Sequence, residues 1–192
     1  MTTPVDKATL EGCFSEHELV TLPEETLECI EHAPSRRFLR EVGLPVHANP
    51  WFDLIDRSAR DLKTVGACYE GLNERWANLP DNAANWILLG TVPYDDIALD
   101  VATGTVLCLP QDEDEVYPLN KDLYSFAHFL YLLEVERPNY DEELNEDLVP
   151  ERAEEAGKRL TEQMRAIDPA ALGVRHSRWH EILGWVSDPD AR

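Results

Sequence analysis

The sequence has little positive charge and no long apolar run. Its 192 residues include 17 Lys and Arg against 38 Asp and Glu, which gives a formal net charge of −21. A surface that grips nucleic acid or an anionic membrane needs clustered Lys and Arg, so the composition argues against both partners. The apolar stretch Phe126–Leu133 is far shorter than the roughly 20 residues of a membrane span. Such an acidic chain fits a basic protein partner, or its charge simply keeps it soluble.

Cysteines are few and scattered. The four of them include no CxxC pair, which favours reduced thiols over a disulfide framework. Residues 1–10 also lack the apolar segment of a signal peptide. We therefore expect a soluble, cytoplasmic protein, and its strong negative charge favours a monomer.

Known catalytic motifs are missing as well. The chain has no Gly-x-Ser-x-Gly elbow, phosphate loop, dinucleotide fingerprint or zinc-deaminase signature. His176 and His180 are four residues apart on an expected helix, a spacing at which two imidazoles can share a metal. Ser177, however, stands where zinc proteases carry Glu. We expect no catalytic residue, no metal and no cofactor; a small metal-dependent hydrolase using the two histidines is the alternative.

The order of the predicted elements is helices, then strands, then helices. Pro23 and the expected N-cap Ser35 begin two early helices, and Gly43 ends the second. Later segments show strand or helix periodicity: strands at 86–90, 97–100, 105–109 and 116–117, and helices after the expected N-cap Ser125, over 153–167 and over 179–186. This order predicts an α+β fold, with residues 1–192 as a single domain.

The negative charge is concentrated in one part of the chain. Residues 111–155 hold 15 acidic side chains against Lys121, Arg137 and Arg152, a net charge of −12. Dense like charges repel one another and do not favour folding. They therefore indicate either a solvated face or a docking surface that steers a cationic partner.

Several short segments, in order, resemble the SUKH superfamily of bacterial immunity proteins, especially its fourth group. The resemblance rests on the sequences SRRFLREVGLP at 35–45, WILLG at 86–90, IALD at 97–100, TGTV at 103–106, LN at 119–120 and SFAHFL at 125–130. It implies a central antiparallel sheet flanked by N-terminal and C-terminal helices. It also implies a non-enzymatic role, in which the protein binds and blocks a polymorphic toxin, commonly a basic nuclease or nucleic-acid deaminase. The acidic stretch is not a family signature.

Charge reasoning alone therefore selects the expected toxin contacts. Acidic side chains would contact the toxin, and two tyrosines would serve as anchors. These residues are Tyr94, Asp95, Asp96, Asp112, Glu113, Asp114, Glu115, Tyr117, Glu142 and Glu143. A regulatory or scaffolding protein outside toxin systems is a further alternative.

Overall fold

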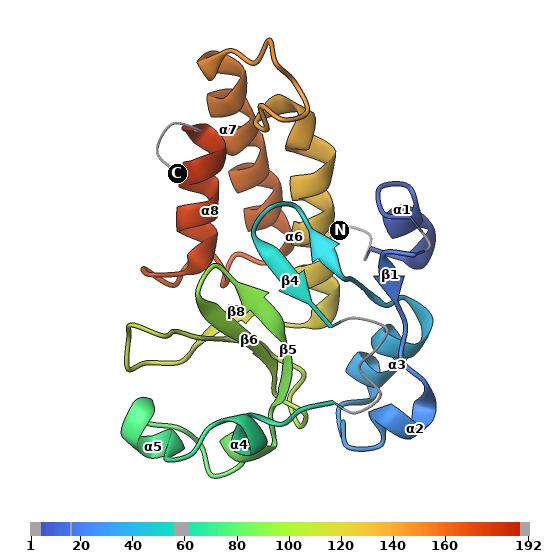
Figure 1. Cartoon of the computed structure of the whole chain (residues 1–192), viewed down its shortest axis with the longest axis vertical. Coiled ribbons are helices and arrows are strands. Elements are labelled where there is room, and N and C mark those ends of the chain that lie inside the picture. The colour runs from blue at the N-terminus through green and yellow to red at the C-terminus, as the bar shows by residue number, and fades with distance from the viewer. Residues whose placement is uncertain (1–4, 16, 56–61, 189–192) are drawn as a thin grey trace.

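Six antiparallel strands form the central sheet of the computed structural model, which describes residues 5–15, 17–55 and 62–188. Each strand pairs with the next one along the chain, so the sheet is a simple meander. In order they are β3 (His47–Ala48), β4 (Phe52–Leu54), β5 (Ile87–Val92), β6 (Asp95–Leu99), β7 (Val106–Leu109) and β8 (Tyr117–Asn120). The predicted α+β class with a central antiparallel sheet is confirmed (Figure 1).

The two faces of this sheet carry separate apolar clusters. Side chains alternate between faces along a strand, and the buried side chains of β6 and β7 follow this rule. Ile97 and Cys108 belong to the large core, whereas Ala98 and Leu107 belong to a smaller cluster on the opposite face. The sheet is therefore covered on both sides.

Three C-terminal helices cover the large core: α6 (Leu123–Glu136), α7 (Pro150–Ile167) and α8 (Arg178–Ser187) (Figure 1). A short 3₁₀ turn, η2 (Arg137–Asn139), follows α6. Ser125 is not the N-cap of α6. Asp122 caps the helix and Ser125 completes a capping box at the third position, so the helix starts three residues earlier than predicted. None of the helices in the described ranges is long and apolar enough to cross a membrane.

The N-terminal part packs beside the sheet (Figure 1). It comprises α1 (Lys7–Glu11), α2 (Glu24–Leu27), α3 (Ala33–Glu41) and a separate ribbon of β1 (Leu19–Val20) with β2 (Leu44–Pro45). Ser35 lies inside α3, where its buried Oγ is 2.8 Å from His32 Nδ1, and His32 is the N-cap. Gly43 follows α3 with a φ of +87°, as its predicted place after the helix requires.

Residues 62–85 cover the second face of the sheet, an arrangement that the sequence patterns do not predict. They form α4 (Val65–Cys68), α5 (Leu72–Arg75) and the 3₁₀ turn η1 (Ala83–Asn85). Trp76 and Trp86 are 1% and 4% exposed and pack with Leu107 and Leu109 of β7. This cover leaves part of the face near β8 open, and the candidate site lies there.

Candidate functional site

The acidic loop, defined here as residues 110–116, joins β7 to β8. Its four consecutive carboxylates, Asp112–Glu115, are exposed, and none of them forms an ion pair with another described residue. Charged side chains avoid burial unless they are paired, so four in a row hold this segment in solvent. The loop thus presents uncompensated negative charge beside the sheet.

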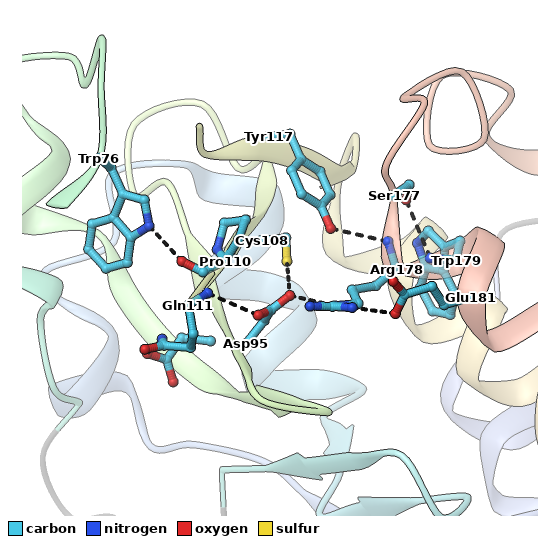
Figure 2. Close-up of polar contacts among 11 residues, drawn as sticks. Trp76, Asp95, Cys108, Pro110, Gln111, Tyr117, Ser177, Arg178, Trp179 and Glu181 are labelled. Carbon is cyan, nitrogen blue, oxygen red and sulfur yellow. Dashed lines mark hydrogen bonds and ion pairs between the residues drawn. The ribbon is translucent and has the colours of Figure 1, made fainter. Parts of the chain in front are cut away.

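Backbone contacts fix the loop at both ends. Ala77 N donates to Asp114 O at 2.6 Å, and Gln111 N donates to Asp95 Oδ1 at 3.0 Å. Trp76 Nε1 donates to Pro110 O at 2.8 Å (Figure 2). All three contacts use main-chain atoms of the loop, so the side chains of Asp112–Glu115 remain available to a partner. The charges are held on an ordered scaffold.

Asp95 has a different role from the one expected for it. It is 1% exposed, and Arg178 Nε of α8 donates to its Oδ2 at 2.5 Å (Figure 2). Arg178 also pairs with Glu181, and the two carboxylates hold the pKa of the guanidinium above its usual value. A partner contact needs an accessible side chain, so the assignment of Asp95 as a toxin contact is corrected. Its ion pair ties the sheet to α8.

Tyr117 is likewise an internal residue. It is 9% exposed, and its hydroxyl accepts a hydrogen bond from Arg178 N at 3.1 Å (Figure 2). Burial raises the pKa of this phenol and that of the neighbouring Cys108 thiol. The assignment of Tyr117 as a toxin anchor is corrected for the same reason as that of Asp95.

Asp96 is half-buried at the base of the acidic loop. Tyr69 Oη donates to its Oδ2, and Gln111 Nε2 lies 3.3 Å from the same atom. Desolvation raises the pKa of this carboxyl, and the hydrogen bond from Gln111 opposes the shift. Asp96 therefore positions the loop while keeping part of its surface accessible.

Tyr94 projects from the same end of the sheet as the acidic loop. Asp96 pairs with Leu109, so the start of β6 lies beside the end of β7, and the Pro93-Tyr94 turn adjoins the loop. The ring is 86% exposed, and its backbone φ is +69°. A positive φ is uncommon for a bulky residue, and such strain is concentrated at functional sites. Tyr94 remains a candidate anchor.

Glu142 and Glu143 lie elsewhere on the molecule. Both are exposed in the connection between η2 and α7. Figure 1 places this connection at the end of the helices remote from the acidic loop. The neighbouring Asp141 is buried and accepts from Arg137 Nε at 2.7 Å. The structure therefore divides the expected contacts into two separate acidic regions.

A groove adjoins the acidic loop on the open part of the second sheet face. Its volume is about 540 Å³, and sequence reasoning did not predict it. It lies between residues 77–80 and the ends of strands β5 to β8. Twelve of the described residues line it: Ala77, Asn78, Leu79, Pro80, Trp86, Asp100, Thr103, Thr105, Leu107, Glu115, Val116 and Pro118.

The two histidines of the alternative hypothesis do not share a helix. Helix α8 begins at Arg178 with Ser177 as its N-cap, so His176 precedes it and only His180 is helical. Both side chains are exposed. Within residues 5–15, 17–55 and 62–188, no three His, Cys, Asp or Glu side chains are grouped so that they could hold a metal ion. The structure gives the metal-hydrolase alternative no support.

Comparison with known proteins identifies the family of this chain. No curated protein and no solved structure matches it significantly. The family model described as SUKH-4 immunity protein matches residues 5–184, nearly the whole chain. That range includes the sheet, the groove, the acidic loop and the first turns of α8. The chain belongs to the SUKH-4 immunity protein family, which implies an immunity function against a toxin.

Proposed function

We propose that this immunity protein neutralises a basic toxin domain, such as a nuclease or a nucleic-acid deaminase, by binding it through the acidic loop and Tyr94. The observation that carries the proposal is the set of four exposed carboxylates at Asp112–Glu115, which form no ion pair with any residue that the structure describes. Enzymes that act on nucleic acid carry basic surfaces, because they must approach phosphates. An acidic loop is complementary to such a surface.

The loop is suited to binding because its backbone is already fixed. Hydrogen bonds from Ala77 N to Asp114 O and from Gln111 N to Asp95 Oδ1 tie its two ends to the rest of the protein. A preformed loop loses little conformational freedom when a partner binds, which favours affinity. Repulsion among its charges is also relieved when a cationic surface approaches, and complementary charge speeds the encounter.

Tyr94 supplies what the carboxylates lack. Exposed charge pairs contribute little affinity each, whereas aromatic side chains buried at an interface often dominate its binding energy. Its 86% exposed ring stands at the tip of the β5–β6 turn beside the loop. We therefore assign recognition and rapid encounter to the carboxylates and most of the affinity to Tyr94. Binding, rather than catalysis, accounts for neutralisation.

Charge reversal at the acidic loop tests this proposal. The variant carries D112K, E113K, D114K and E115K, and stopped-flow association with the purified toxin domain is measured at several salt concentrations. We expect association at low salt to slow at least about tenfold and to lose its salt dependence, because steering raises association rates by up to several hundredfold. Unchanged rates at low salt would exclude steering by the loop.

A matched control separates position from net charge. The variant E142K, E143K, E146K and D147K changes the formal charge by the same amount, and all four residues are exposed on the connection remote from the loop. We expect it to slow association much less than the loop variant. Equal slowing would mean that overall charge, not the acidic loop, attracts the toxin.

A further inference from the structure

The groove beside the acidic loop has a composition that fits one kind of occupant. Its walls include the apolar side chains of Leu79, Leu107 and Val116, and its polar lining includes Asp100 and Glu115. None of the described residues that line it is Lys, Arg or His. We infer that this groove holds an extended basic segment of the toxin, whose Lys or Arg side chain pairs with Glu115. The inference rests on the proposed function and names the contact that the groove adds to it.

The two carboxylates leave the groove negatively charged. Asp100 accepts hydrogen bonds from Ala102 N at 3.0 Å and from Thr103 Oγ1 at 2.8 Å in its own turn, and from Asn82 Nδ2 at 3.5 Å. These donors are neutral, so they satisfy the oxygens without cancelling the charge. Glu115 is exposed and forms no ion pair with any described residue. A cationic side chain entering the groove would therefore meet two uncompensated negative charges.

The apolar walls match the rest of such a side chain. Lys and Arg carry three or four methylene groups below the charged head, and these pack well on apolar surface. Leu107 is 8% exposed and Val116 is half-buried, so the walls are partly covered before any partner binds. A purely apolar occupant would leave the carboxylates unpaired, and a compact cation would leave the apolar walls uncovered. An extended basic segment would pair with the carboxylates and also cover the walls.

An indole ring in the wall of the groove provides a reporter of the occupant. Trp86 lines the groove and is 4% exposed, and its Nε1 has no hydrogen-bond acceptor among the described residues. A buried indole N–H nearly always has a partner in a folded protein. That nitrogen is itself covered by protein, so the Trp86 ring reports on occupation of the groove and is not a hydrogen-bond donor to the occupant.

The groove exists before binding because main-chain contacts hold both of its sides. Ala77 N donates to Asp114 O, and Ala77 bridges Glu115 in parallel, which joins the 77–80 wall to the acidic loop. Thr105 and Leu107 belong to or adjoin β7 in the sheet. Glu115 belongs both to the acidic loop and to the wall of the groove. Charge reversal at Glu115 is therefore expected to change both the attraction of the toxin and the occupation of the groove.

Nuclear magnetic resonance tests the inference without the toxin. The ¹⁵N-labelled full chain is titrated with the synthetic peptide acetyl-Val-Lys-Val-Lys-Val-amide, and with the same peptide carrying Glu in place of Lys. The indole N–H signal of Trp86, assigned with W86F, reports on the groove. We expect it to shift with the Lys peptide only. E115Q should weaken the peptide's binding about threefold, as loss of one exposed ion pair does, while the matched loop variant E113Q should not.

Shifts confined to the amides of Asp112–Asp114, with the Trp86 indole signal unmoved, would overturn the inference, because they would reflect general attraction to the loop. A second experiment measures the affinity for the toxin itself. T105W is expected to fill the groove. Full toxin affinity in this variant would overturn the inference that the groove holds a toxin segment, while leaving the proposed function intact. Peptide binding at Trp86 without toxin binding would uphold the groove and refute the proposed function.

Discussion

Removal of the Asp95 carboxylate should destabilise the protein rather than weaken a contact with its partner. Asp95 is 1% exposed and accepts from Arg178 Nε at 2.5 Å and from Gln111 N at 3.0 Å. In D95A the guanidinium of Arg178 loses its buried partner, and the Gln111 N–H loses its acceptor. Breaking a buried ion pair by removing one partner costs about 3–5 kcal/mol.

The loss should fall near the lower end of this range. Arg178 is 18% exposed and keeps its pair with Glu181 at the protein surface, so its charge is not fully stranded. We expect D95A to lower the free energy of unfolding by about 3 kcal/mol, which for a domain of this size lowers Tm by about 6–12 °C. D112A, at an exposed carboxylate of the acidic loop, should change the stability by less than about 0.5 kcal/mol.

Urea unfolding followed by circular dichroism measures both variants, and calorimetry gives Tm. A loss below about 1 kcal/mol in D95A would refute the structural role of the ion pair. D95N separates the two effects, because its amide oxygen can still accept from Gln111 N while the charge opposite Arg178 is gone. It should fall between D95A and the natural protein.

Three other predictions test separate parts of the structure. G104A should destabilise by at least about 1–3 kcal/mol in urea unfolding, because Gly104 has a φ of +80° and an added Cβ would lie 2.0 Å from His32 Nδ1; unchanged stability would contradict the packing of this turn on α3. The Arg159 guanidinium, which donates to Glu136 at 2.7 Å, holds the pKa of that carboxyl below its usual value. The pair should therefore stabilise fully above the unfolded pKa of about 4.3 and lose its effect as the pH falls through the folded pKa. E136Q should cost about 1 kcal/mol at pH 7, less at pH 3, and an equal loss at both pH values would contradict this. Y94A should weaken toxin binding at least about tenfold with Tm nearly unchanged, because the ring is 86% exposed and alanine keeps the same positive φ; unchanged affinity would remove Tyr94 as an anchor.

Periodic patterns in the sequence predicted most of the central sheet and the C-terminal helices. The alternation at 97–100 and the β-rich run at 105–109 correspond to β6 and β7, and the apolar stripe at 153–167 lies in α7. These elements are long or strongly patterned, so local sequence carries their signal. The helix starts were less accurate, because Ser35 and Ser125 lie inside their helices and another residue caps each one.

The second face of the sheet was not predictable in the same way. Its cover consists of helices of only four residues, α4 and α5, and a three-residue turn, which are too short to show a helical period. Its two buried tryptophans, Trp76 and Trp86, gain their environment from β7, which follows them in the chain. The groove is formed by this packing and therefore has no local signature.

The candidate contacts also differ in whether local sequence determines their exposure. Four consecutive acidic residues at Asp112–Glu115 indicate an exposed segment, because four unpaired charges are rarely buried together. Asp95 looks equally acidic in the sequence, yet its partner Arg178 is 83 residues away. Its burial depends on how α8 packs against β6, and the local sequence around Asp95 does not indicate that contact.

Co-expression with the toxin tests the central claim most directly. The chain and the toxin domain encoded by the adjacent reading frame are expressed together, cell survival is scored, and the lysate is resolved by size-exclusion chromatography. We expect survival together with a stable complex of the two proteins, and loss of both when Asp112–Glu115 and Tyr94 are replaced together. Continued killing with no complex would contradict the account.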